Sequence, residues 1–179
     1  QTRPEKNGYS WHRCRRSVKG RRDPEAFARE RDHQTALQAM ADAGLIDLFH
    51  FDASGCATRP SVPYAWQPVG TTLALPSFKS KRLNVLGFLS KDPRAFFRHA
   101  EAPVDTGQVV AAFDAVAAQR AAGYAVHGRP GVVNLDNASW HSSQAFRDRM
   151  DGWAACGVVV HDLPPYSPEL HAIEILWRK

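Results

Sequence analysis

The sequence predicts an α/β fold built on a mixed sheet, in which three leading strands precede alternating helices and parallel strands. Residues 46–51 and 130–135 are short apolar runs that stop at Asp52 and Asp136. Such runs, bounded by turn or polar residues, indicate buried strands. Residues 105–121, which lie between them, carry apolar side chains at helical spacing. Helices that alternate with strands favour right-handed crossovers between parallel strands.

The other elements follow from local turn and capping signals. A helix is predicted from Asp23 to Gly44, with Pro24 at its first position. Residues 53–70 are rich in proline and glycine and indicate a loop or hairpin, while residues 92–104 are ambiguous. Further strands are expected at residues 71–75, 82–89 and 157–161. Two further helices are expected, one over residues 142–154 and a last one that begins at Pro168 with Ser167 as its cap.

Composition and charge narrow the class of protein. The 179 residues suffice for one domain, and they contain neither an apolar run long enough to span a membrane nor a secretory signal. The three cysteines, Cys14, Cys56 and Cys156, are far apart, which argues against a thiolate zinc site or a disulfide framework and favours a reducing cytoplasm. The net charge of +5 favours nucleic acid as the partner.

Six basic residues crowd one short segment near the start of the chain, with no acid among them. They are Arg13, Arg15, Arg16, Lys19, Arg21 and Arg22. One interpretation is a solvated, flexible arm. The other is a segment that contacts DNA phosphates, whose binding would weaken steeply with salt.

Three acidic residues are poorly explained by a purely structural role. Asp52 and Asp136 follow apolar strands, where functional groups of open α/β sheets gather, although a lone aspartate there is more often a cap. Glu174 lies on the helix face formed by Leu170, Ile173 and Trp177. A carboxylate on such a face is costly unless it is paired, bound to a metal or able to reach solvent at the edge of the face.

Together these carboxylates predict a site for hard divalent cations. Three inward carboxylates without a Cys/His cluster suit Mg²⁺ or Mn²⁺ and not structural zinc. Two such ions about 4 Å apart would activate a water or hydroxyl and stabilise the leaving oxygen of a phosphodiester. A basic chain with such a site is the expected design of a nuclease or a strand transferase.

Three ordered motifs surround these acids. They are Leu-Asp-Asn-Ala-Ser-Trp-His at residues 135–141, Leu-Pro-Pro-Tyr-Ser-Pro-Glu-Leu at 163–170 and Ile-Glu-Ile-Leu-Trp at 173–177. The chain thereby resembles the DDE superfamily endonucleases, and more closely the bacterial insertion-sequence transposases related to the mariner superfamily. Residues 9–23, 52–55, 63–70 and 83–87 also look like that family. The 37 residues between Asp136 and Glu174 are a compatible spacing.

The resemblance implies an RNase H-like fold and an Asp-Asp-Glu triad, Asp52, Asp136 and Glu174, that holds two Mg²⁺ or Mn²⁺ ions. It implies cleavage of double-stranded DNA at transposon terminal inverted repeats, strand transfer into target DNA at TA dinucleotides, and a homodimer in a synaptic complex. The implied compartment is the bacterial cytoplasm, in association with the nucleoid. His141 is expected to orient a phosphate or a metal ligand. Asn137 either lies beside Asp136 in a supporting role or caps the next helix.

Two departures from the family pattern bear on activity. Ala53 follows the first aspartate where the family often has Glu, and His171-Ala172 stands where it usually has Asn-Pro. Neither change removes a triad carboxylate, but both could shift the geometry of the site. We expect His171 to be a surface histidine, with contact to metal or phosphate as the alternative, and Tyr166 and Trp177 to be packing residues.

The resemblance divides the chain into residues 1–44, a basic linker and helix that would follow a missing N-terminal helix-turn-helix region, and residues 45–179, a catalytic domain truncated in its last helix. One hypothesis is an active metal-dependent strand transferase. Another is a catalytically inactive remnant that only binds DNA or a partner subunit, which Ala53, His171 and the truncated ends would favour. A structure-directed nuclease of the same fold is disfavoured by the Pro-Pro-Tyr-Ser-Pro turn and the basic linker.

Overall fold

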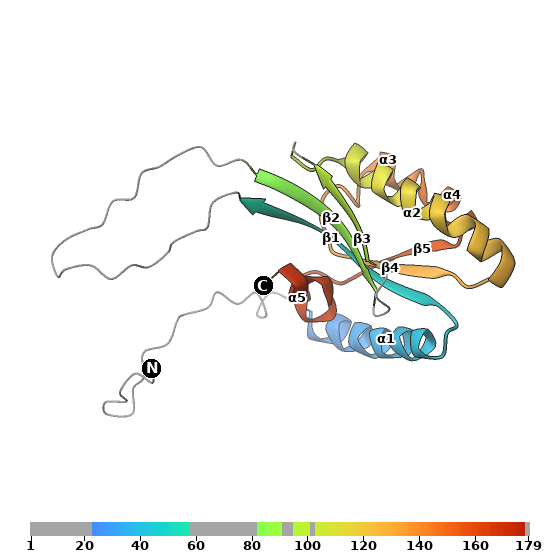
Figure 1. Ribbon diagram of the computed structural model, residues 1–179. Coiled ribbons are helices and arrows are strands. Elements are labelled where there is room, and N and C mark those ends of the chain that lie inside the picture. The colour runs from blue at the N-terminus through green and yellow to red at the C-terminus, as the bar shows by residue number, and fades with distance from the viewer. Residues whose placement is uncertain (1–22, 58–81, 91–94, 101–102, 178–179) are drawn as a thin grey trace, which may run out of the picture.

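The computed structural model describes residues 23–57, 82–90, 95–100 and 103–177 (Figure 1). In chain order the elements are α1 (Pro24–Asp42), β1 (Asp47–Ala57), β2 (Arg82–Ser90), β3 (Ala95–Ala100), α2 (Thr106–His127), β4 (Gly131–Leu135), α3 (Gln144–Arg147), α4 (Met150–Ala155), β5 (Val158–Asp162), the 3₁₀ turn Pro168–Leu170 and α5 (Ile173–Trp177). Among the helices of these residues, none combines the length and the hydropathy that a membrane span requires.

The strands of the described residues form one mixed sheet in the order β3-β2-β1-β4-β5. Strands β1, β2 and β3 pair antiparallel, whereas β4 and β5 continue the sheet parallel to β1. Helices α2, α3 and α4 cover one face of this sheet, and α1 and α5 lie on the other (Figure 1). The predicted mixed α/β sheet is therefore confirmed, with β1, β2 and β3 as its leading strands.

The larger core lies between the sheet and α2 and is built on aromatic rings. The centroid of the Phe113 ring lies 5.0 Å from that of Phe51, 4.9 Å from Phe88, 5.2 Å from Phe146 and 4.9 Å from Trp153. All five side chains are almost fully buried. Such rings bury large apolar areas, and tilted or edge-to-face pairs add about 0.5–1.5 kcal/mol each. Phe113 therefore fixes α2 to the sheet and links it to α3 and α4.

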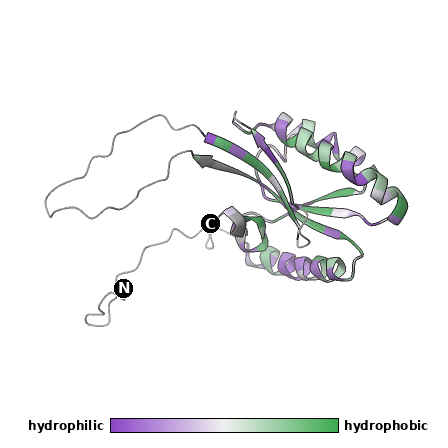
Figure 2. Cartoon of the chain, in the orientation of Figure 1, coloured by the Kyte–Doolittle hydropathy of each residue, from purple (hydrophilic) through white to green (hydrophobic). Residues whose placement is uncertain are grey.

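Helix α1 is attached to the opposite face by a smaller contact. Figure 2 shows α1 as the more hydrophilic of the two long helices. Its apolar contact with the sheet is a small cluster in which Leu37 packs with Ile46 and Leu48. The side chains of Gln34 and Asn134 add two amide hydrogen bonds of 3.1 and 2.7 Å. Because Asn134 is fully buried on β4, α1 supplies the partners that this amide requires.

The strand boundaries differ from the sequence predictions in two places. Strand β1 passes Asp52 and continues to Ala57, because β2 pairs with it along that whole length, so the loop predicted for residues 53–70 begins too early. The ambiguous residues 92–104 contain β3, which β2 also recruits by pairing. The strand predicted at residues 71–75 lies outside the described residues.

Two of the predicted helices have different ends. Helix α2 runs beyond residue 121 and stops where Gly128 adopts a left-handed φ of 63°. The helix predicted over residues 142–154 is interrupted between α3 and α4, where the Arg149 N–H bonds to the carbonyl of Phe146 three residues back. The Arg149 side chain at this break lies 2.7 Å from Asp114 of α2.

The last helix begins at Ile173 and not at Pro168. His171 and Ile173 are 2% and 0% exposed, and two residues this close in sequence point to opposite sides of an α-helix. A continuous helix from Pro168 could not bury both against one sheet. Ser167 lies directly before the 3₁₀ turn, where its carbonyl accepts the Leu170 N–H and its hydroxyl donates to the carbonyl of Pro165.

A buried ion pair joins α2 to the start of β1 and gives a test of this architecture. Asp47, 9% exposed, lies 2.9 Å from Arg120 and 3.6 Å from Arg129. Replacing it in Asp47→Ala leaves the Arg120 guanidinium buried without its carboxylate, so we expect the free energy of unfolding to fall by about 3–5 kcal/mol in urea denaturation. Asp32→Ala, which breaks an exposed pair with Arg31, should cost less than about 1 kcal/mol. Equal losses in both variants would contradict this assignment.

Candidate active site

The pleat of two neighbouring strands places two predicted site residues on one face of the sheet. On β1, Leu48 packs with α1, and successive side chains of a strand alternate between faces, so His50 and Asp52 share the face of Leu48. Parallel pairing sets His50 beside Asn134 of β4, and Asp136 lies two residues beyond Asn134. Asp52 and Asp136 therefore both lie on the face that carries α1 and α5, just past the point where β4 separates from β1.

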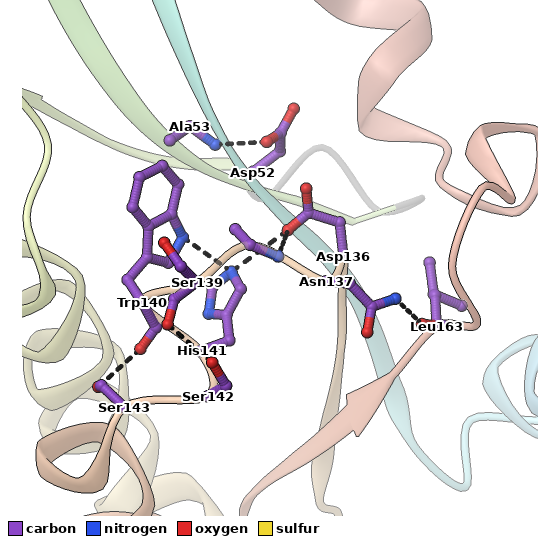
Figure 3. Close-up of polar contacts among 11 residues, drawn as sticks. Asp52, Ala53, Asp136, Asn137, Ser139, Trp140, His141, Ser142, Ser143 and Leu163 are labelled. Carbon is purple, nitrogen blue, oxygen red and sulfur yellow. Dashed lines mark hydrogen bonds and ion pairs between the residues drawn. The ribbon is translucent and has the colours of Figure 1, made fainter. Parts of the chain in front are cut away.

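Asp52 is half-buried in the middle of β1. Its Oδ1 accepts the Ala53 N–H at 2.7 Å (Figure 3). The pKa of Asp52 is raised to about 6, mainly because burial disfavours the charged carboxylate, and also because Asp136 and Glu174 are negatively charged neighbours. The Ala53 N–H and the Trp177 indole act in the opposite direction and do not cancel the effect.

Asp136 stands just beyond β4 in a more favourable environment. Its Oδ1 accepts the Ala138 N–H at 3.2 Å and lies 3.4 Å from Nε2 of His141 (Figure 3). Burial alone would raise the pKa of Asp136, but His141 and the Ala138 N–H together lower it below its usual value. The two aspartates are therefore unequal, since Asp136 is stabilised as an anion and Asp52 is not.

His141 makes two contacts through the same nitrogen. The Trp140 indole N–H donates to its Nε2 at 3.1 Å, while Asp136 lies on that nitrogen at 3.4 Å (Figure 3). One nitrogen cannot accept a proton from Trp140 and donate one to Asp136 together. Nε2 therefore either accepts the hydrogen bond from Trp140 or carries the proton that it donates to Asp136. His141 is only 8% exposed, so it acts on Asp136 from within the fold.

Asn137 joins the ends of two strands. Its side-chain amide donates to the Leu163 carbonyl, just after β5, at 2.6 Å (Figure 3). The cap of α3 is Ser143, whose hydroxyl accepts the Phe146 N–H. Asn137 therefore caps no helix among the described residues, and it holds the Asp136 loop against the segment that leads to α5.

The segment before Glu174 is docked on β1 by two histidines. Nδ1 of His50 accepts the Ala172 N–H at 3.4 Å, and the rings of His50 and His171 are 5.6 Å apart. Burial, followed by the neighbouring His171, lowers the pKa of His50 to about 4. His171 is 2% exposed, so the expectation of a surface histidine is wrong. This ring is buried because the chain between the 3₁₀ turn and α5 passes directly over β1.

Close packing fixes α5 itself. Gly87 of β2 pairs with Asp52, and a Cβ on Gly87 would lie 3.0 Å from Phe97 and 3.2 Å from Ile173. The Trp177 ring lies edge-on to that of Phe97 at 6.4 Å, in line with its predicted packing role. The missing side chain at position 87 thus lets α5 approach the sheet beside Asp52.

Asp136 and Glu174 line one open pocket of about 450 Å³, together with Asn137, Pro165, Tyr166 and His171. Tyr166 is 44% exposed and has a positive φ of 61°, so it is not the packing residue that the sequence suggested. The pocket is open to solvent. It is the concave surface on which the predicted residues Asp136 and Glu174 meet.

The structure brings the three carboxylates onto one face, but it does not bring their oxygens into one tight group. Among the His, Cys, Asp and Glu side chains of the described residues, one group of three has ligand atoms that all lie within 4.8 Å of one another. That group is Glu30, His33 and His161, and it includes none of the three carboxylates. Like charges repel at short range in a partly buried site, so separation is expected without a cation. The basic residues predicted to contact phosphate, at positions 13–22, lie outside the described residues.

Sequence reasoning did not single out His50 or Trp140. Both left a signal, because His50 precedes Asp52 by two residues on the same strand face and Trp140 precedes the selected His141. The sequence did not predict that His50 contacts Ala172 or that Trp140 donates to His141.

Comparison with known proteins identifies the fold. Residues 47–179 match the family model described as DDE superfamily endonuclease, and a search of curated proteins finds no match. The solved Mos1 transposase paired-end complex with left transposon end has a TM-score of 0.59 at 16% identity, over 94% of this chain and 52% of that chain. The catalytic domain of Mos1 mariner transposase has a TM-score of 0.55 at 14% identity, over 87% of this chain and 70% of that chain.

A third structure, the Mos1 mariner paired end complex with Mn, has a TM-score of 0.59 at 16% identity, over 90% of this chain and 49% of that chain. The chain therefore spans about half the length of the transposase in these complexes. Similarity at this level of identity concerns the fold, and it confirms the predicted RNase H-like architecture.

The raised pKa of Asp52 predicts a pH-dependent instability of the metal-free protein. Its folded pKa of about 6 exceeds the reference value of 3.8, so the stability it contributes at low pH is lost as pH rises through 6. We expect Asp52→Asn, which mimics the protonated acid, to stabilise the protein at pH 8 by on the order of 2 kcal/mol and to have little effect near pH 4. Urea denaturation in EDTA measures the free energy of unfolding at both pH values, and the exposed Asp162→Asn serves as the control. A pH-independent difference would contradict the assignment.

The lowered pKa of His50 predicts the opposite pH dependence. The pKa of His50 in the folded protein, about 4, lies below the reference value of 6.5. The stability that His50 contributes is therefore present above pH 6.5 and lost as pH falls through 4. His50→Asn keeps an acceptor for the Ala172 N–H but does not titrate. We expect the wild type to lose up to about 3 kcal/mol more than this variant between pH 7 and pH 4. Parallel pH profiles in chemical denaturation would rule out this role of His50.

Proposed function

Because the chain belongs to the DDE superfamily endonucleases, we propose that it is the catalytic domain of a DNA transposase. It cleaves DNA at transposon ends and transfers the cut strand into target DNA, as a bacterial insertion-sequence enzyme related to the mariner superfamily. One observation carries the proposal: carboxylates from β1, from the residue after β4 and from α5 lie on one face of the sheet, where the negative charges of Asp136 and Glu174 help to raise the pKa of Asp52.

The donor set fits Mg²⁺ or Mn²⁺. Asp52, Asp136 and Glu174 offer carboxylate oxygens, which hard cations prefer. Burial, and to a lesser extent the negative charges of Asp136 and Glu174, raise the pKa of Asp52, and a bound cation would offset this effect. The Mos1 mariner paired end complex has been solved with Mn and with Mg. Two bound ions would supply an activated water or hydroxyl and stabilise the leaving oxygen.

The chain's own residues hold and orient these ligands. His141 and the Ala138 N–H keep Asp136 ionised and ready to bind. Asn137 fixes the loop that carries it. His50 and His171 seat the segment that leads into Glu174, so the third carboxylate is positioned from the sheet. The pocket of Asp136 and Glu174 is also lined by Asn137, Ala138 and His171, so a phosphate there would lie beside these three residues.

DNA binding is proposed for the basic segment, Arg13, Arg15, Arg16, Lys19, Arg21 and Arg22. These side chains would contact phosphates, which give affinity and salt dependence without sequence selectivity. The comparison proteins include a paired-end complex with a transposon end. For this chain we propose double-stranded DNA at terminal inverted repeats and at TA target sites, a homodimeric synaptic complex, and the bacterial cytoplasm as compartment.

The alternative is a catalytically inactive remnant that binds DNA or a partner subunit. The observation in its favour is that the three carboxylates are not gathered into one tight group of ligand atoms. Ala53 and His171, which depart from the family pattern, both lie at the site. In this alternative the fold is retained and the carboxylates do not assemble around metal.

Plasmid nicking distinguishes the two functions. We expect nicking in Mn²⁺ or Mg²⁺ that falls roughly 100-fold or more in Asp136→Asn, because metal-assisted stabilisation of charge is worth several kcal/mol. The matched control is Asp162→Asn, an exposed aspartate at the end of β5, which should nick like the wild type. Nicking that persists in Asp136→Asn would refute the triad. Absent nicking by the wild type, with DNA binding intact, would support the remnant.

A further inference from the structure

We propose that Glu30, His33 and His161 form a second metal site, for Zn²⁺ or a similar transition metal, that clamps α1 to the edge strand β5. Their ligand atoms all lie within 4.8 Å of one another. None of the three belongs to the proposed catalytic set. The site is composed of one turn of α1 and one strand residue that lies more than a hundred positions later in the chain.

The contacts among the three side chains already bring the donors together. Nε2 of His161 lies 2.8 Å from Oε1 of Glu30, and the rings of His33 and His161 stack at 4.7 Å. Glu30 and His33 are three residues apart on α1 and so share one face of the helix. His161 lies opposite Asn134 in the parallel ladder of β4 and β5, which directs its side chain to the face that carries α1.

A second layer of hydrogen bonds holds the carboxylate in place. The Gln34 amide donates to Oε1 of Glu30 at 2.9 Å and also bonds to the buried Asn134. The Glu30 side chain is 14% exposed and that of His161 is 23% exposed, while His33 is exposed. Metal sites are commonly supported in this way, with ligating side chains oriented by further hydrogen bonds. Glu30 and His161 are therefore held in place, whereas the exposed His33 side chain can rotate toward them.

The donor chemistry selects a different metal from the catalytic carboxylates. Two imidazoles and one carboxylate are the three-ligand set of several zinc sites, with a fourth position left for water. Imidazole nitrogen suits Zn²⁺, Co²⁺ or Ni²⁺, whereas Mg²⁺ prefers oxygen. Bonds of about 2.0–2.1 Å at tetrahedral angles place ligand atoms about 3.3 Å apart. Binding would therefore move Glu30 and His161 slightly apart from their 2.8 Å contact and draw in His33, a movement that its exposure permits.

The consequence of binding is a tighter attachment of α1. The apolar contact of this hydrophilic helix with the sheet is one small cluster, Leu37 with Ile46 and Leu48, and a metal bridge to β5 would reinforce it. A metal that binds only the folded protein also stabilises it, by an amount that grows with the logarithm of its concentration above Kd.

Titration of the full chain with Co²⁺ and Zn²⁺ in excess Mg²⁺ tests the proposal. We expect one Co²⁺ per chain with visible absorption typical of nitrogen and oxygen ligands, and a rise of Tm with Zn²⁺. His33→Ala removes an exposed ligand and should weaken binding by more than the roughly 10–100-fold that loss of a merely orienting residue costs. The matched control, His99→Ala, removes an exposed histidine of β3 and should bind like the wild type.

Glu30→Gln provides a second ligand variant and Asp136→Asn separates the site from the catalytic carboxylates. We expect weakened Co²⁺ binding in Glu30→Gln and unchanged binding in Asp136→Asn. Equal affinities for the wild type, His33→Ala and His99→Ala would overturn the proposal, and so would the absence of Co²⁺ absorption. Either result would leave Glu30 and His161 as an ion pair only, and neither would bear on nicking in Mg²⁺.

Discussion

The parallel pairing of β1 with β4 is the constraint on which the candidate site depends. It sets His50 beside Asn134 and thereby places Asp52 and Asp136, each two residues further on, on one face where the two strands separate. A shift of one residue in this register would turn Asp136 toward the aromatic core around Phe113. That core, packed on the other face by α2, is what makes the register unambiguous.

Placing several carboxylates close together affects their pKa values unequally. Burial and the negative charges of Asp136 and Glu174 favour the protonated form of Asp52. Asp136 is relieved by His141 and the Ala138 N–H. Asp136 is therefore ionised and available as a metal ligand, whereas the Asp52 anion is unfavourable until a cation binds beside it. This asymmetry is what a metal-dependent enzyme of this family would use.

The docking of α5 explains how the chain accommodates a departure from its family. His171, which departs from the expected family pattern, is buried beside His50 and not displayed at the surface. The neutral His50 receives the Ala172 N–H, so the backbone before Glu174 is tied to β1. Gly87 leaves the space that Ile173 needs. The position of Glu174 therefore depends on a polar contact and a close packing contact together.

The sequence by itself determined the features that depend on local pattern. Strand periodicity, the turn at residues 163–168 and the motif residues sufficed to predict a mixed sheet, its parallel half and the positions of Asp52, Asp136 and Glu174 along the chain. Tertiary structure decided what depends on partners distant in sequence: the pairing with β2 that extends β1 past Asp52, the burial of His171, and the meeting of Glu30 and His33 with His161. These follow from register and packing between segments, and a pattern read along one segment does not contain the atoms on the other side of the contact.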